Sequence, residues 1–368
     1  MATVQATREQ VLAFRAAAQS LGRRRPATEL GDVVGACGLQ DTPPGNAEVS
    51  LAARLDIDAP LVAEKVAARE LVLTWSLRGA PHAFPRQDFG VFTIGACPRP
   101  GTRQGLWGQP EEALVEVERA MVAVIGALPR PKAEVSTAVT ASVPPELAPW
   151  CSGCNVHHPN ESIVRAAPLL GRLVLTATAP VLLARAGTWL GTEAGGEPGA
   201  LRTELLRRYL HCYGPTTSGH FAEWAGIAKS DATQRWAAVA DRLVAVRGAA
   251  RGFVLEEDLP VLEEPPVSTG VRLLPAKDTF LQARDRDVLF PDPANRKAVF
   301  PTLGGPGVVL HEALPVGTWR GVAKGRRYQV TVAPFSTLPT GTWAEIEVEA
   351  ERVAHVRGHE SATVVQRA

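Results

Sequence analysis

The spacing of apolar positions changes along the first part of the chain, from a helical repeat to stretches typical of β-strands. Residues 8–20 carry apolar side chains close to a period of 3.6, which predicts a helix. Two more helices are predicted over 27–38 and 45–55, and two β-like stretches follow within 70–89, joined near Gly79. Three helices followed by a β-hairpin are the element order of a winged helix.

The same order of elements recurs twice more without obvious sequence identity. In the second copy, helices over 111–128 and 161–170 precede a hairpin over 171–185. In the third copy, helices are predicted over 202–213, 217–226 and 229–243, and a hairpin over 243–258. Winged helices also build protein-interaction scaffolds, so one copy alone decides little. Three copies in a row favour binding to a nucleic-acid duplex.

The clearest domain boundary is the proline-rich stretch over 263–270, beyond which the pattern changes to strands. These strands are predicted over 307–310, 315–335 and 342–356. The sequence therefore predicts an α+β protein with a β-rich C-terminal region. The predicted domains are winged helices over 1–90, 91–198 and 199–262, and the β-rich region over 266–368.

Composition narrows the class of protein. The chain has 368 residues, of which 45% are hydrophobic and 21% charged, as in ordinary globular proteins. The formal net charge of +1 excludes a polycationic DNA-coating protein but allows a local basic face. Five cysteines form no disulfide framework, the N-terminal segment lacks a secretory pattern, and no apolar run reaches membrane-spanning length. We expect a cytoplasmic, nucleoid-associated monomer without a membrane anchor.

Several segments together resemble one known family. They are 39–55, 73–84, 209–227, 273–301, 307–310 and 317–335. The most specific blocks are WSLRGAPH and GTWR…KGRR. The chain resembles, over nearly its whole length, the bacterial winged-helix DNA-binding family that contains the AlkZ-type DNA glycosylases. The resemblance implies a C-shaped clamp of tandem winged helices. It also implies excision of bulky or crosslinked alkylated purines from double-stranded DNA.

The family's catalytic motif is glutamine, an apolar residue and glutamine. The matching triplet here runs from Gly38 to Gln40 and is followed by Asp41, so Gly38 replaces the first glutamine. The resemblance implies that Gln40 lies in the active site. An amide suffices chemically, because an N-alkylated purine is already a cationic leaving group. Gln40 would hold a water, and Asp41 would polarise it or stabilise the cationic sugar. Alternatively, Gln40 and Asp41 form a turn and helix cap.

Two residues near the first predicted hairpin are candidates for DNA contact. Arg78 and His82 are an even number of residues apart, so on one strand their side chains would share a face. Arg78 would pair with a phosphate, and His82 would contact a sugar or the lesion. For His82 a structural role is an equal alternative. Trp75 is predicted to be a core residue.

A second basic feature lies near the C-terminus. Arg320, Lys324, Arg326 and Arg327 surround Gly325, and a strand of alternating pattern follows. This arrangement predicts a hairpin with a basic tip, which we expect to contact DNA phosphates or a groove. The alternative is an ordinary solvated turn.

The string from Cys151 to His158 has a spacing that metal sites use. Cys151, Cys154 and His157 would supply three zinc ligands. A fourth ligand would be His158, Glu161 or Cys212. Paired thiols without metal are the alternative, because one CxxC is weak evidence. Our prediction for the protein as a whole contains no cofactor and no metal.

These features favour a monofunctional DNA glycosylase, because no lysine lies near Gln40 in the sequence to form a Schiff base. Its role would be DNA repair or self-resistance to a DNA-alkylating natural product. Two alternatives remain open. One is a winged-helix damage sensor or regulator that binds DNA without catalysis, which Gly38 favours. The other is a protein-interaction scaffold.

Overall fold

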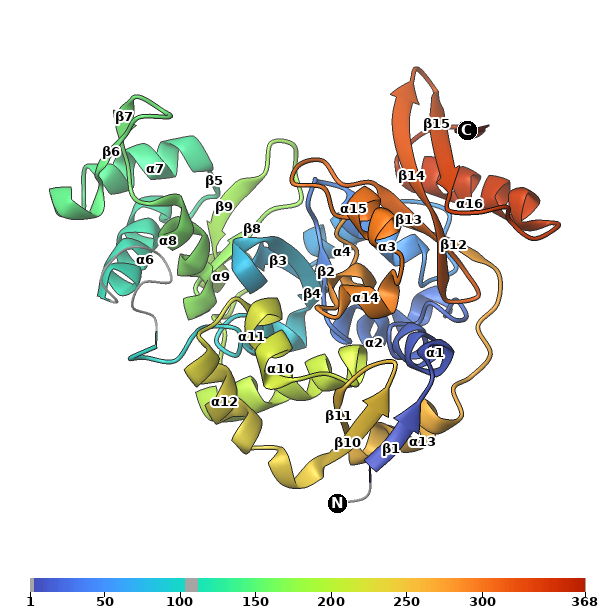
Figure 1. The fold of residues 1–368 in the computed structure, drawn as a ribbon. Coiled ribbons are helices and arrows are strands. Elements are labelled where there is room, and N and C mark those ends of the chain that lie inside the picture. Colours follow the sequence, from blue (N-terminus) through green and yellow to red (C-terminus); the bar gives the residue numbers. More distant parts are fainter. Residues whose placement is uncertain (1–2, 103–111, 368) are drawn as a thin grey trace. The chain divides into compact units, whose positions relative to one another are not determined.

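A computed structural model describes residues 3–102 and 112–367 (Figure 1). The chain forms two compact units, and each is assembled from separate segments. The first unit contains residues 1–62, 207–220 and 240–368, and the second contains 63–206 and 221–239. Both units mix helices and strands, so the predicted α+β class is confirmed. In the described part of the chain, no helix has the length and apolar character needed to span a membrane.

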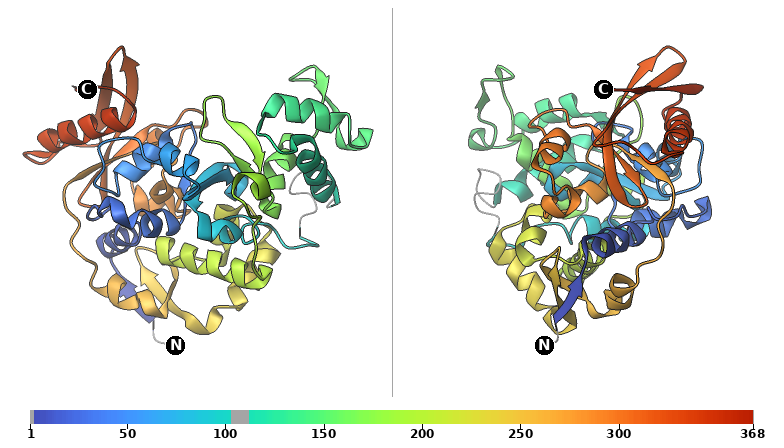
Figure 2. Two further views of the ribbon diagram at one scale, coloured as in Figure 1. Left: turned by 180° about the vertical axis from the view of Figure 1, so that it is seen from behind. Right: turned by 45° about the vertical axis from the view of Figure 1, so that its right-hand side comes forward.

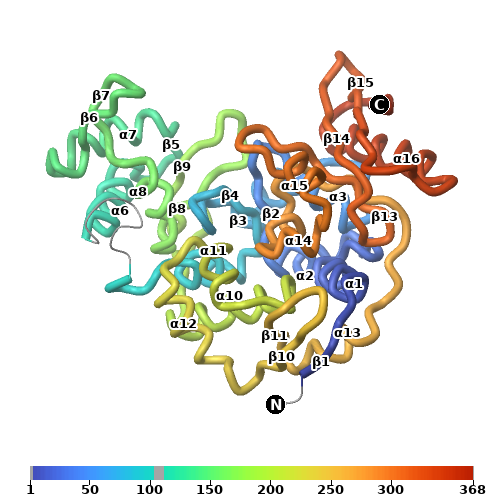
Figure 3. Tube along the Cα trace, in the orientation of Figure 1, coloured from blue at the N-terminus to red at the C-terminus, as the bar shows by residue number. Residues whose placement is uncertain are grey.

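The first unit joins the N-terminal helices to the C-terminal part of the chain, as the trace in Figure 3 shows by colour. Helix α1 (Arg8–Ala18) begins with a capping box formed by Thr7 and Gln10. It buries Val11, Leu12 and Phe14, which confirms the predicted helical face. The helices and strands that follow are α2 (Leu30–Gly35), β2 (Leu39–Gln40) and α3 (Asn46–Ala52).

A small three-stranded sheet lies in the same unit. Its strands are β1 (Thr3–Ala6), β10 (Leu243–Gly248) and β11 (Gly252–Leu255). β1 runs parallel to β10, and β10 and β11 form the antiparallel hairpin that the sequence predicts over 243–258. Helix α13 (Leu259–Glu263) follows β11 and packs against α1.

The C-terminal region contains a five-stranded sheet in sequential order. Its strands are β12 (Val271–Leu274), β13 (Gly307–His311), β14 (Leu314–Lys324), β15 (Arg327–Pro334) and β16 (Ser361–Gln366). Between β12 and β13 lie the short helices α14 (Arg286–Leu289) and α15 (Pro293–Val299).

The strand predicted over 342–356 is wrong. This segment is α16 (Thr342–Val356), which packs against β12 and β16 of the sheet (Figure 2). Its buried positions include Ile346, Ala350 and Val353, spaced four and three residues apart. That spacing places them on one helical face, and the alternation read as a strand came from the glutamates between them.

The second unit is built on a sheet in which the two predicted wings meet. The strands that this unit contributes to the sheet are, in order, β4 (Pro81–Pro85), β3 (Leu71–Trp75), β8 (Leu173–Leu175), β9 (Leu182–Arg185) and β5 (Arg130–Pro131). β3 and β4 confirm the hairpin predicted within 70–89, and β8 and β9 confirm that over 171–185. The pair Leu73 and Leu175 joins them.

Helices complete this unit. They are α4 (Val62–Ala67), α5 (Phe89–Phe92), α6 (Glu112–Ile125), α7 (Lys132–Thr140), α8 (Glu161–Ala166), α9 (Ala186–Trp189) and α12 (Lys229–Ala237). α6 confirms the helix predicted over 111–128, although residue 111 lies outside the described residues. Two helices, α10 (Pro198–Tyr213) and α11 (Ser218–Ala225), cross the unit boundaries and confirm the prediction over 202–213 and 217–226.

Candidate functional site

Gln40 is a buried residue whose amide is held by a second glutamine. It ends β2, and only 7% of its surface is exposed. Gln282 Nε2 donates a hydrogen bond to Gln40 Oε1 at 3.0 Å and another to the backbone oxygen of Lys277, also at 3.0 Å. Gln282 therefore fixes the orientation of the Gln40 amide and leaves its oxygen a second lone pair.

Asp41 faces the start of α3. Its Oδ1 accepts a hydrogen bond from the backbone N–H of Ala47 at 3.0 Å. Burial raises the pKa of the Asp41 carboxyl, while hydrogen bonds from the backbone N–H groups of Ala47 and Gly45 oppose that shift. The carboxylate therefore serves as a cap for α3, which is the structural alternative drawn from the sequence.

Gly38 adopts a backbone conformation that favours glycine. Its φ of +69° lies in the left-handed region, where a side chain costs about 1–2 kcal/mol. The replacement of the motif's first glutamine is thus matched to the local backbone. A Gly38→Gln substitution would introduce strain together with the amide, so it is a poor test of the missing side chain.

A buried ion pair supports this region. Arg54 and Asp278 form two hydrogen bonds of 2.8 Å, and their side chains are 2% and 0% exposed. Asp278 also accepts from the Ser50 hydroxyl at 2.6 Å and from the Phe280 N–H at 2.9 Å. The pair joins α3 and its following turn to the segment that carries Lys277 and Gln282. Lys277, Asp278 and Gln282 lie within 273–301. This stretch contributed to the family resemblance, but the sequence identified none of the three as a site residue.

Lys277 is far from Gln40 in the sequence but belongs to the same hydrogen-bonded group in the fold. Its backbone oxygen accepts from the same Gln282 amide nitrogen that donates to Gln40, so the fold brings a lysine of a distant segment into the neighbourhood of Gln40, although none lies near it in the sequence. Its residue surface is exposed. Lys277 and Gln40 are 237 positions apart, and only the fold brings their two segments together.

In the second unit, Arg78 and His82 do not share a strand face, which corrects the prediction. Arg78 lies in the 3₁₀ turn Leu77–Gly79 with a φ of 56°, outside β3 and β4. Its Nη1 donates to the backbone oxygen of Trp224. His82 is buried on β4, and its Nδ1 lies 2.9 Å from the Ala80 oxygen. Trp75 is buried, as predicted for a core residue.

The environment of His82 predicts a pH-dependent stability. Burial, followed by the charge of Arg78, lowers the pKa of His82 from 6.5 to about 3. Below about pH 6.5, the His82 imidazole therefore binds a proton in the unfolded chain but not in the folded chain. We expect this residue to lower the free energy of unfolding by about 2 kcal/mol between about pH 8 and pH 5. Urea unfolding at both pH values, compared between the wild type and a variant at position 82, isolates this loss, because His211, whose pKa Asp258 raises, acts in the opposite direction.

A His82→Gln variant should lack this component of the pH dependence, and a variant at the exposed His355, His355→Gln, should retain it. Equal pH dependence in the wild type and His82→Gln would contradict the depressed pKa of His82.

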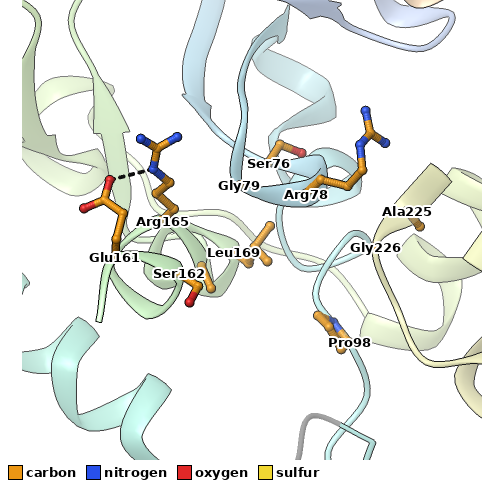
Figure 4. Close-up of a pocket in the computed structure, with 11 residues that line it drawn as sticks. Ser76, Arg78, Gly79, Pro98, Glu161, Ser162, Arg165, Leu169, Ala225 and Gly226 are labelled. Carbon is orange, nitrogen blue, oxygen red and sulfur yellow. Dashed lines mark hydrogen bonds and ion pairs between the residues drawn. The ribbon is translucent and has the colours of Figure 1, made fainter. Parts of the chain in front are cut away.

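A cavity of about 360 Å³ lies beside this turn (Figure 4). Two guanidinium groups, those of Arg78 and Arg165, contribute to its lining, and Arg165 Nε binds Glu161 Oε1 at 2.6 Å. The remaining lining residues are Glu161, Ser76, Gly79, Pro98, Ser162, Ala166, Leu169, Ala225 and Gly226. The lining therefore has mixed charge, because the Arg165 guanidinium is already paired with the Glu161 carboxylate. Arg165 lies in no recognisable motif, so the sequence did not point to it.

The basic hairpin forms as predicted. β14 ends at Lys324, β15 begins at Arg327, and Gly325 at a φ of 60° begins the two-residue turn between them. Lys324, Arg326 and Arg327 are all exposed. Arg326 forms an ion pair with Glu360, and the exposed Arg320 donates from Nη2 to the Gly304 oxygen at 2.7 Å. The turn therefore presents cations to solvent next to one acidic partner.

The cysteine-rich string forms a cluster with His158, which the sequence offered as a possible fourth ligand, and not with His157, the predicted third ligand. Ligand atoms of Cys151, Cys154 and His158 lie within 4.8 Å of one another. His157 is not in this group, and its Nδ1 lies 3.0 Å from the Ala148 oxygen. Hydrogen bonding from the backbone of Cys154, followed by an interaction with His158, lowers the pKa of Cys151 to about 7.

The two other proposed fourth ligands have partners of their own. Glu161 binds Lys132 Nζ at 2.5 Å in addition to Arg165. Cys212 is buried in the first unit, where its thiol interacts with that of Cys37.

Comparison with known proteins places these residues in a family. A sequence model described as "DNA glycosylase AlkZ-like" matches residues 33–356, a range that contains Gln40, Gln282 and the basic hairpin. The chain is 26% identical over 386 residues to the "Interstrand DNA cross-link repair glycosylase" of Streptomyces sahachiroi, covering 96% of this chain and 98% of that protein.

A solved structure gives the same fold. The structure titled "Streptomyces sahachiroi DNA glycosylase AlkZ" matches with a TM-score of 0.77 and 24% sequence identity, over 99% of this chain and 100% of the solved one. At this identity the structural match establishes the fold, and the family match over most of the sequence establishes the relationship. The chain belongs to the AlkZ-like DNA glycosylase family.

Proposed function

We propose that this protein is a DNA glycosylase that removes N7- or N3-alkylated purines from double-stranded DNA. The observation that carries the proposal is the Gln40 amide, buried within the family-matching range and oriented by Gln282. In this proposal, the segments 1–90, 91–198 and 199–262 act as winged helices on the duplex, followed by the region 266–368. The protein acts as a monomer.

Cleavage of the bond between sugar and alkylated base needs little help from a general acid. Alkylation gives the purine a positive charge, so the base leaves as a neutral molecule and the sugar becomes cationic. Gln40 Oε1, which keeps a lone pair while it accepts from Gln282, receives a hydrogen bond from the attacking water. Asp41 supplies negative potential close by, although its carboxylate also holds the start of α3. Gln282 acts as a positioning residue.

We further propose that water, and not Lys277, attacks the sugar. The experiment is a base-release assay with purified protein and a duplex that carries 7-methylguanine. Base release should exceed the spontaneous rate, and borohydride should trap no covalent protein–DNA adduct. A trapped adduct that disappears in Lys277→Met would overturn the monofunctional reading. Lesion-preferring binding without base release would instead support the non-catalytic damage sensor.

The substrate range follows from the family relationship as a proposal. The Streptomyces sahachiroi relative is named for interstrand cross-link repair. We propose that this chain also acts on bulky or crosslinked alkylated purines, in DNA repair or in self-resistance to a DNA-alkylating natural product. Expression in an alkylation-sensitive bacterial strain should raise survival under a bulky alkylating agent, and a Gln40→Ala variant should not.

DNA binding should depend on the basic hairpin. Reversing both charges in Arg326→Glu with Arg327→Glu removes up to two phosphate contacts, and each contact contributes about 0.9 to the slope of log affinity against log salt. We expect weaker binding to duplex DNA and a slope about 1–2 smaller in magnitude. Fluorescence anisotropy over a salt series measures both quantities.

The matched control changes two other exposed arginines, Arg119 and Arg130, to glutamate. This control should leave the slope near that of the wild type. If the hairpin variant also keeps the wild-type slope, the tip is an ordinary solvated turn.

A further inference from the structure

The cluster of Cys151, Cys154 and His158 lies outside the residues that the proposed glycosylase uses. Their sulfur and ring-nitrogen atoms all lie within 4.8 Å of one another, and no other three histidine, cysteine or acidic side chains of the described residues are grouped in this way. In a tetrahedral zinc site, bond lengths of about 2.1 Å to nitrogen and 2.3 Å to sulfur place ligand atoms about 3.5–3.8 Å apart. Small side-chain rotations would bring the three groups to that spacing.

The hydrogen bonding of the His158 ring is that of a metal ligand. His158 Nδ1 lies 2.7 Å from the Pro159 backbone oxygen, which makes this nitrogen the one that carries the proton. Nε2 therefore holds the lone pair. This atom is shielded from solvent, and the ring interacts with the Cys151 thiol beside it. A metal-binding histidine shows the same division, with one nitrogen fixed by a carbonyl and the other open to the ion.

The backbone around the cysteines has the form of a tight ligand turn. Asn155 adopts a φ of 56°, and its N–H donates to the Cys151 backbone oxygen at 2.8 Å. This turn brings the Cys151 and Cys154 sulfurs within 4.8 Å of each other.

The hairpin that carries the cluster has little other support. β6 (Trp150–Cys151) and β7 (Val156–His157) have two residues each and pair only with each other among the described strands. Trp150 and Val156 are 56% and 51% exposed, so the hairpin buries little apolar surface. An isolated two-stranded hairpin is marginal in water, and a metal crosslink would provide the missing stability.

We propose that Cys151, Cys154 and His158 bind one Zn²⁺ ion that ties β6 and the turn after it to the residue that follows β7. Two thiolates and an imidazole are soft and borderline ligands that select zinc over magnesium or calcium. On binding, each thiol releases its proton to solvent, and no redox change occurs. Water occupies the fourth position, which the exposed Cys154 leaves accessible. The role is structural and independent of Gln40.

The test uses the full chain, purified without a His tag or chelators and incubated with zinc sulfate before desalting. Elemental analysis should give about one equivalent of zinc per chain. Cys151→Ser, Cys154→Ser and His158→Gln should each lower the zinc content at least fivefold. The matched control His157→Gln changes a neighbouring histidine outside the cluster and should keep the wild-type content. Cobalt substitution should give a thiolate-to-cobalt charge-transfer band and intense tetrahedral visible bands.

Three results would overturn the proposal. They are a zinc content below about a tenth of an equivalent in the wild type, full zinc retention in the Cys151→Ser/Cys154→Ser double variant, and a Cys151–Cys154 disulfide that persists under reducing purification. None of these results bears on base release, which the glycosylase assay measures separately.

Discussion

Replacing Gln40 with alanine is expected to slow the release of 7-methylguanine by about 100-fold or more, down towards the spontaneous rate. The amide oxygen that would hold the attacking water is lost. Gln282 does not replace it, because its amide nitrogen is the donor in the bond to Gln40. DNA affinity should change little, because phosphate contacts dominate binding. Single-turnover base release and anisotropy on the same duplex measure the two quantities.

Two variants make this result interpretable. Gln5→Ala removes a glutamine that is exposed on β1 and should release base at the wild-type rate. Gln282→Ala leaves Gln40 in place but frees its amide, so we expect a smaller loss than for Gln40→Ala. Wild-type rates in a folded Gln40→Ala protein would remove Gln40 from the catalytic machinery and would favour its alternative role in a turn.

Replacing Asp278 with alanine is expected to lower the free energy of unfolding of the first unit by about 3–5 kcal/mol. The change leaves the Arg54 guanidinium buried without its carboxylate, and it also removes the acceptor for the Ser50 hydroxyl. Burying an unpaired charge is far more costly than losing a surface ion pair. Urea unfolding of the variant and wild type measures the difference.

The matched control is Glu64→Ala, which breaks an ion pair between Glu64 and Lys65 at the surface. Such an exposed pair contributes little to stability, so the control should unfold close to the wild type. A loss below about 1 kcal/mol for Asp278→Ala would mean that Arg54 finds solvent or another partner. The glycosylase proposal does not depend on this outcome.

The sequence was a good guide wherever structure depends on local pattern. The helix beginning at Arg8 and the hairpin at the KGRR block both appear in the structure near their predicted bounds. Periodicity and turn residues act over a few positions, so they can be read without the fold. The same local reading failed for α16, because alternating glutamates resemble a strand while the buried residues follow a helical period.

Local spacing was less reliable for side-chain direction. Arg78 and His82 were placed on one face by counting positions, but a turn with left-handed backbone separates them. In the cysteine string, the two thiols lie close together with His158, a candidate fourth ligand, whereas His157, the predicted third ligand, turns to the Ala148 oxygen. Counting assumes a regular element, and both sites lie at turns.

By itself, the sequence determined the α+β class, most helices and hairpins, and the resemblance that the family match confirms. The tertiary structure alone decided what surrounds the candidate catalytic residue. Gln40 meets Gln282 across 242 positions, and Arg54 meets Asp278 across 224. Such pairs carry no local signal, because a hydrogen bond between distant segments depends on how the core packs and not on the residues beside either partner.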